Sequence, residues 1–151
     1  MRSAAAILAL VLGTAAAAAA EPPLPEVAAA LGRITRHSTV ELTTTGRKSG
    51  KEHTKPIWFV VDGGKILLQA GKDGKTDWYQ NLLKTPAVTA RQGDYTFRGK
   101  AVPVTDPARV EKIHRLFLDK YTTAWLLSFF GSSIGRGQPV ELTPQSVAVR
   151  R

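Results

Sequence analysis

The chain has 151 residues, 43% of them hydrophobic, and a formal net charge of +9 at pH 7. This length allows one domain with a single core. The chain contains no cysteine, which excludes disulfides and lipid-modified cysteines, and its three histidines lack metal-ligand spacing. The positive charge favours anionic partners. Nucleic acid is not expected, because no helix-turn-helix, zinc or RNA-binding motif accompanies the charge.

Residues 1–20 have the layout of a secretory signal peptide. Arg2 precedes an alanine-rich apolar run that ends in a small-residue cleavage pattern, Ala18-Ala19-Ala20. The prolines that follow prevent this segment from continuing as a helix. We therefore expect a Sec-type signal that is cut after Ala20, and an exported protein, periplasmic or secreted. An uncleaved membrane anchor is the alternative, disfavoured because the run is short and weakly hydrophobic.

The rest of the chain is expected to hold a linker with a short helix over residues 21–38 and one domain over residues 39–151. Residue patterns predict these elements in chain order: a helix over 27–34, strands over 40–44, 56–61 and 65–70, a helix over 76–84, strands over 88–92 and 95–104, a helix from 107 to about 121, and a strand over 138–142. Short strands joined by tight turns, with few helices, are typical of an α+β protein built on a small antiparallel β-barrel of about six strands with peripheral helices.

One loop has the composition of an anion-binding site: Thr43-Thr44-Thr45-Gly46-Arg47-Lys48-Ser49-Gly50-Lys51. Its glycines allow backbone N–H groups to turn toward phosphate oxygens, and its cations add charge-assisted hydrogen bonds. We expect Arg47 to be an exposed loop cation that contributes little to fold stability. A basic surface hairpin that binds nothing would have the same composition.

Several motifs follow one another in a recognisable order: the loop above, Pro56, Asp62-Gly63-Gly64, Trp78-Tyr79-x-Asn81-Leu82, Pro86-x-Val88 and Thr105-Asp106-Pro107. Together they resemble the deazaflavin-dependent nitroreductase family. Members of that family share a split β-barrel related to the flavin-binding pyridoxamine phosphate oxidase folds. The resemblance therefore implies a split barrel for residues 39–151.

The resemblance also implies a cofactor, the 8-hydroxy-5-deazaflavin coenzyme F-420, lying along a groove of the barrel with its anionic tail on the basic loop. Residue by residue, it implies cofactor contacts from Arg47, Lys48, Ser49, Gly50, Lys51, His53, Pro56, Lys72 and Trp78. His53 stands where the family usually has arginine, so this contact is expected to be weaker here. Trp78 is equally compatible with a plain core position.

The chain offers little acid–base chemistry of its own, so the cofactor would carry the reaction. We expect hydride transfer to a small apolar acceptor such as a quinone or nitro compound, with the proton from solvent or Tyr79. Two alternatives stay open: an exported, non-catalytic barrel that binds an anionic amphiphile such as a fatty acid or haem, and an FMN-binding flavoprotein. Family analogy predicts a homodimer. The apolar cluster Trp125–Phe130 is compatible with core, a lid over a hydrophobic substrate, or association with a membrane surface.

Overall fold

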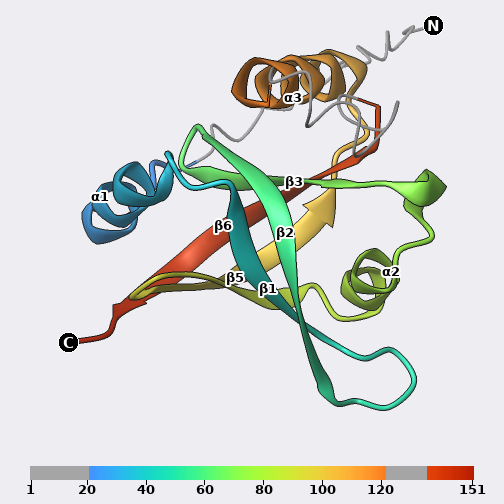
Figure 1. Cartoon of the computed structure of the whole chain (residues 1–151), viewed down its shortest axis with the longest axis horizontal. Coiled ribbons are helices and arrows are strands. Elements are labelled where there is room, and N and C mark those ends of the chain that lie inside the picture. The colour runs from blue at the N-terminus through green and yellow to red at the C-terminus, as the bar shows by residue number, and fades with distance from the viewer. Residues whose placement is uncertain (1–20, 122–135) are drawn as a thin grey trace, which may run out of the picture.

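The computed structural model of the protein describes residues 21–121 and 136–151. The described strands are β1 (Thr39–Thr45), β2 (Glu52–Asp62), β3 (Lys65–Ala70), β4 (Ala87–Gln92), β5 (Tyr95–Pro103) and β6 (Gln138–Val149) (Figure 1). The helices are α1 (Pro25–Ile34), the 3-10 helix η1 (Lys72–Gly74), α2 (Asp77–Lys84) and α3 (Pro107–Lys120). No helix in these two ranges is long and apolar enough to cross a membrane. The expected signal peptide and the cluster Trp125–Phe130 lie outside the described residues.

The six strands form one closed barrel in the order β1-β2-β3-β6-β5-β4, with each neighbouring pair antiparallel. Asp62 and Lys65 pair across the two-residue turn Gly63-Gly64. The φ angles of this turn, 59° and 74°, lie in the left-handed region that glycine adopts without strain. The antiparallel barrel with helices outside it confirms the expected α+β fold.

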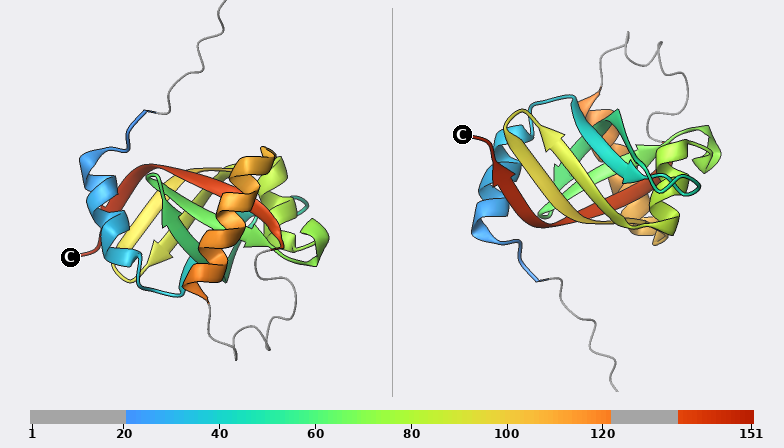
Figure 2. Two further views of the ribbon diagram at one scale, coloured as in Figure 1. Left: turned by 90° about the horizontal axis from the view of Figure 1, so that it is seen from above. Right: turned by 90° about the horizontal axis from the view of Figure 1, so that it is seen from below.

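Two helices close the ends of the barrel. Figure 2 shows α1 at one end, and α2 with the β1–β2 loop at the opposite end. Val27 and Leu31 of α1 and Leu82 of α2 are at most 2% exposed and belong to the same buried cluster as Phe59 and Phe97 of the strands. Because side chains fill the barrel interior, a ligand has to bind outside it.

The third helix, α3, covers part of the outer barrel surface. Its buried residues Ile113 and Phe117 form a second cluster with Val60 of β2 and Leu67 of β3. The neighbouring residue Phe59 faces the interior cluster instead. Successive side chains of β2 and β3 therefore serve two cores, as the two-residue period of a strand requires.

Two strands are longer than the sequence pattern predicts. β2 begins at Glu52 instead of residue 56, and β6 continues to Val149 instead of ending at residue 142. The added segments are largely exposed, so no apolar alternation marks them. The pairing of β5 with β6 also shifts register beside Gly99, where a Cβ atom would lie 2.0 Å from the carbonyl oxygen of Thr143. Glycine is required at this close approach.

A network of charges ties α3 to the barrel. Arg109 of α3 donates hydrogen bonds to Asp62 (2.7 Å) and Glu141 (2.5 Å), and Lys65 donates to Glu141 (2.7 Å). The hydrogen bond from Arg109 is the main cause that lowers the pKa of Asp62. Burial by itself would raise the pKa of Glu141, but the bonds from Lys65 and Arg109 outweigh it and lower that pKa as well. Both carboxylates are thus charged partners of α3 at neutral pH.

Arg109→Met should lower the free energy of unfolding by about 2–3 kcal/mol at pH 7, because it leaves two largely buried carboxylates without their shared cation. Carboxyls whose pKa is lowered by folding stabilise the protein above their ordinary pKa, and this stabilisation disappears as the pH falls through the folded-state values. Urea unfolding at decreasing pH should therefore show the difference between wild type and variant shrinking below about pH 4. Arg115→Met, which removes only the exposed pair with Glu111, is the matched control. Equal losses in the two variants would contradict the network's role.

Candidate cofactor groove

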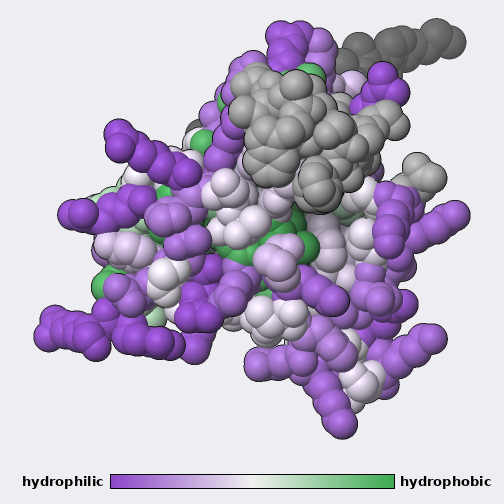
Figure 3. Space-filling model, viewed as in Figure 1, coloured by the Kyte–Doolittle hydropathy of each residue, from purple (hydrophilic) through white to green (hydrophobic). Residues whose placement is uncertain are grey.

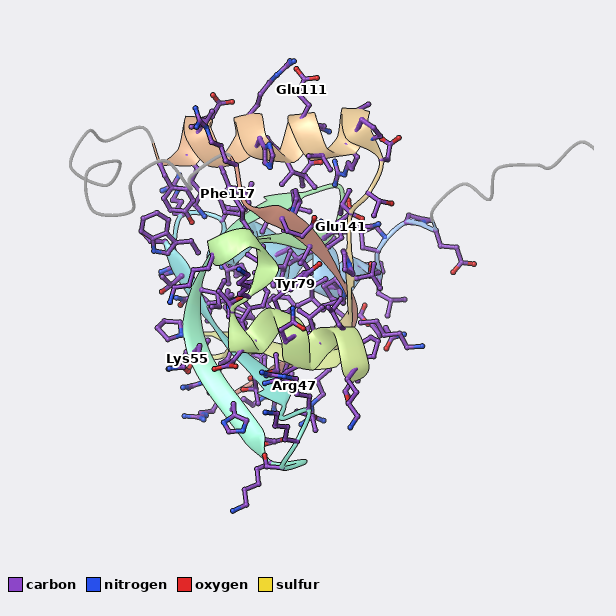
Figure 4. All side chains as sticks on the ribbon, turned by 90° about the vertical axis from the view of Figure 1, so that its right-hand side faces the viewer. Arg47, Lys55, Tyr79, Glu111, Phe117 and Glu141 are labelled. Atoms are coloured by element: carbon purple, nitrogen blue, oxygen red, sulfur yellow. The ribbon has the colours of Figure 1, made fainter. Side chains whose placement is uncertain are left out.

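A groove lies on the outside of the barrel, between β2 and the segment from η1 to α2. Its basic part has a volume of about 610 Å³ and is lined by five cations: Arg47, Lys48, Lys55, Lys72 and Lys75. Figure 4 shows two of them from the two sides, Lys55 on β2 and Arg47 beside α2. Among the described residues only Asp77 brings a carboxylate to this part. The surplus of positive charge suits a ligand with several negative charges.

The second part of the groove, about 530 Å³, is apolar. Its walls include the side chains of Ile57 and Trp58 from β2, Trp78 from α2 and Phe117 from α3. The two parts share five lining residues: Pro56, Ile57, Lys72, Thr76 and Trp78. They therefore form one continuous groove with a charged end and an apolar end. Figure 3 shows a small apolar area in the middle of one face, with hydrophilic side chains projecting around it.

The loop that carries the first basic residues is a tight turn between β1 and β2. Gly46 donates its N–H to the carbonyl oxygen of Lys51 (2.7 Å) and accepts the N–H of Gly50 (2.8 Å), whose φ is 69°. A Cβ atom on Gly46 would lie 2.6 Å from Ser49 Oγ and 2.8 Å from His53 Nε2. Glycine at position 46 therefore lets the serine and histidine side chains approach each other at the groove.

Two backbone N–H groups of the loop remain available to an anion. Within the described part of the chain, those of Lys48 and Ser49 have no hydrogen-bond partner, whereas the other N–H groups of residues 46–51 are engaged. The expected inward-turned N–H groups are thus limited to this pair.

Arg47 differs from the exposed cation that the sequence suggests. Its side chain is 33% exposed and donates to Asn81 Oδ1 (3.0 Å) and Asp77 Oδ1 (3.1 Å), and its backbone N–H also donates to Asn81 Oδ1 (3.1 Å). Lys84 donates to the carbonyl oxygen of Arg47 (2.8 Å), and Asn81 in turn donates to the hydroxyl of Thr44 (3.2 Å). Arg47 fastens the loop to α2. The expectation of an exposed side chain is therefore wrong, because a loop pattern cannot reveal partners 30 or more residues away, and the expectation that Arg47 contributes little to stability stays a prediction.

The groove brings together seven of the nine residues expected to contact the cofactor: Arg47, Lys48, Ser49, His53, Pro56, Lys72 and Trp78. Gly50 and Lys51 belong to the same turn but do not line the groove. Trp78 is 8% exposed and both lines the groove and belongs to the core, so its two expected roles coexist. These contacts with a cofactor stay predictions.

Tyr79, the candidate proton donor, lines neither part of the groove. Its ring packs edge-on against Trp78, with centroids 6.2 Å apart, and a Cβ atom on Gly74 would lie 3.1 Å from it. Its position gives no support to a role in proton transfer.

Three residues that line the groove were not among the expected cofactor contacts: Lys55, Lys75 and Asn81. Lys55 follows His53 by two positions, so its presence on the same face of β2 would follow from strand alternation once the strand is known to begin at Glu52. Lys75 stands directly before the Thr76 cap of α2, without a distinctive motif. Asn81 is only 3% exposed, and its role depends on the distant contact with Arg47.

Aromatic residues at the end of α3 support the apolar part of the groove. Trp58 stacks on Tyr121 with ring centroids 4.7 Å apart and 12° between the planes, and Phe117 lies 5.9 Å from Tyr121. Burial raises the pKa of Tyr121 to about 12 and lowers that of Lys120 to about 8. Lys120 Nζ donates to the carbonyl oxygen of Phe59 (2.8 Å) and lies 4.0 Å from the centre of its ring. Tyr121 is thus a neutral hydroxyl at physiological pH.

A model of the F-420H2-dependent quinone reductase family matches residues 26–124, and the chain belongs to this family. This confirms the resemblance found in the sequence motifs. The match lends no support to the alternative of an FMN-binding flavoprotein.

Solved structures agree with this fold. A conserved hypothetical protein of Mycobacterium tuberculosis superposes with a TM-score of 0.64 at 20% identity, covering 83% of this chain and 84% of that one. An F-420H2-dependent reductase gives 0.52 at 27% identity, with coverage of 74% and 94%. An F-420 reductase gives 0.57 at 20% identity, with coverage of 76% and 92%.

Lys72 combines a groove position with a strained backbone. It is the one non-glycine residue with positive φ (52°) among residues 21–121 and 136–151. Lys72→Gly should remove this strain and leave stability unchanged or raise it by up to about 1 kcal/mol, yet weaken binding of coenzyme F-420 through the lost charge. Lys72→Ala, which loses the charge but keeps the strain, should weaken binding equally without a gain in stability. Thermal unfolding and a cofactor titration measure the two effects. A glycine variant less stable than the alanine variant would argue against strain at this position.

Proposed function

We propose that this protein binds coenzyme F-420 in the groove and uses its reduced form to reduce a small apolar acceptor, with quinones as the first candidates and nitro compounds as the second. The observation that carries the proposal is the continuity of the groove, whose basic end and apolar end share five lining residues. A deazaflavin with a polyanionic tail has the same division of charge. Membership of the reductase family supports the reaction class.

The residues present fit such a cofactor. The N–H groups of Lys48 and Ser49 are available for phosphate oxygens. Lys55 and Lys75 line the basic end without an ion pair among the described residues. Thr76 Oγ1, from a residue at the junction of the two parts, is buried and has no hydrogen-bond partner in the described part of the chain. An anionic ligand that accepts hydrogen bonds would satisfy these free donors and would neutralise the surplus positive charge.

The chain's own contribution to the reaction would be position and exclusion of water. When bound, the deazaflavin supplies the hydride. Ile57, Trp58 and Trp78 offer flat or branched apolar surface against which ring systems can lie. Among the described residues that line the apolar end, only Lys72 is ionisable, so we expect the proton to come from its ammonium or from solvent.

We also propose that the protein is exported and acts as a homodimer. The signal-like layout of residues 1–20 supports export, and a related structure of 27% identity described as a domain-swapped dimer supports self-association. Native mass spectrometry of the extracytoplasmic protein should find a dimer of chains that begin at Glu21. Chains that still begin at Met1 would favour the anchor, and monomers would count against the dimer.

The double substitution Lys48→Ala and Lys55→Ala should weaken binding of coenzyme F-420 by roughly tenfold or more, because it removes two charge-assisted contacts to the tail. The loss should be larger at low salt, since ions screen exposed charges. Titration at two salt concentrations measures both effects, together with oxidation of the reduced cofactor by menadione and by a nitroaromatic compound. Lys100→Ala, an exposed cation on β5 away from the groove, is the control.

Three outcomes would weigh against this assignment. Equal affinities in wild type and the double variant would place the tail elsewhere. Absence of cofactor binding with retention of a fatty acid or haem would favour the non-catalytic binding protein. If the protein binds coenzyme F-420 but reduces neither acceptor, the cofactor site stands and the proposed substrates are wrong.

A further inference from the structure

Trp58 stands at the place where β2 changes partner. It is the last residue of β2 paired with β1, opposite Thr39, and the next residue, Phe59, is paired with β3, opposite Leu68. Its side chain lines the apolar end of the groove. The orientation of this indole ring therefore decides how wide and how flat that part of the groove is.

Tyr121 lies against Trp58 and is itself firmly held. The two rings stack with centroids 4.7 Å apart and nearly parallel planes, and Tyr121 is only 2% exposed. Its hydroxyl lies within donating distance of the carbonyl oxygens of Ser38 (2.7 Å) and Phe59 (2.8 Å) and accepts the N–H of Phe59 (3.1 Å). One hydroxyl thus connects the segment before β1 with β2.

The hydroxyl occupies a gap in the sheet. The pairing with β1 ends at Trp58, and Phe59 would otherwise leave backbone groups inside the protein without partners on that side. Tyr121 satisfies the N–H and shares the carbonyl oxygen with the ammonium group of Lys120 (2.8 Å). The hydroxyl accepts one hydrogen bond and has one proton for the two nearby carbonyl oxygens. These contacts leave the ring little freedom to tilt, and the stacked indole is restrained with it.

We propose that Tyr121 is a positioning residue of the groove: it fixes the Trp58 ring as a flat wall for the ring system of a bound ligand. Tyr121 itself does not line the groove, so it acts through Trp58. The part of this inference that concerns ligand affinity rests on the proposed binding of coenzyme F-420. The part that concerns the orientation of Trp58 holds for the protein without a ligand.

The first test compares Tyr121→Phe with Tyr121→Leu. The Tyr121→Phe variant keeps the aromatic stack but loses the hydroxyl. It should have a lower melting temperature than wild type, yet retain the near-ultraviolet circular dichroism band of the stacked pair. Because the hydroxyl no longer holds the ring, its affinity for coenzyme F-420 should fall between those of wild type and the leucine variant. Leucine should lose the band and weaken binding roughly three- to tenfold. A leucine variant that keeps the band, or that binds coenzyme F-420 as tightly as wild type, would overturn the proposal.

The second test is a double-mutant cycle with Trp58→Leu. If Tyr121 acts through Trp58, Tyr121→Leu should cause no further loss of cofactor affinity once Trp58 is replaced, whereas additive losses would overturn the proposal. Ile113→Val, which trims a fully buried residue of the same cluster, controls for loss of stability alone and should leave the affinity unchanged. An affinity loss in this control as large as in Tyr121→Leu would also overturn it.

Binding of coenzyme F-420 and restraint of Trp58 by Tyr121 can be tested separately. If wild type does not bind coenzyme F-420, the proposed function fails. The orientation of Trp58 is then decided by circular dichroism alone: loss of one common band in Trp58→Leu and Tyr121→Leu supports the inference, and its persistence in the tyrosine variant overturns it.

Discussion

The groove depends on the change of partner along β2. This strand pairs with β1 over residues 52–58 and with β3 over residues 59–62, so its first half has no partner on the β3 side. The chain after β3 turns away into η1 and α2, and the open space between these segments and the unpaired half of β2 is the groove. Pro56, which has no N–H, lies in the half of β2 that pairs with β1 but has no partner on the β3 side.

A groove lined with cations needs its walls to be held against their mutual repulsion. The clamp between Arg47 and Asn81 meets this need at the basic end, because one buried amide accepts from both the side chain and the backbone of the arginine. At the apolar end, Tyr121 plays the corresponding part through hydrogen bonds to the backbone around Phe59. Both walls are thus set by polar contacts between segments far apart in the chain, before any ligand is present.

Much of the fold and of the groove can be predicted from the sequence. The features that cannot be predicted lie where no local pattern marks them. The turn Gly63-Gly64, the cap of α3 by Asp106 and seven of the residues that line the groove were predictable, because turn chemistry, capping and a motif order are local. The exposed start of β2 was not, since an exposed strand carries no apolar alternation. Lys55 was missed for the same reason.

The sequence by itself determined the fold class, the family and the basic character of the site, because these follow from residue patterns within short segments. Only the tertiary structure decided which cations face the groove and which hold it together. Arg47 and Lys48 are neighbours of similar charge, yet Arg47 is bound to α2 and Lys48 is not. That difference arises from a helix that begins 30 residues further along the chain, and contact across such a separation depends on how the barrel closes.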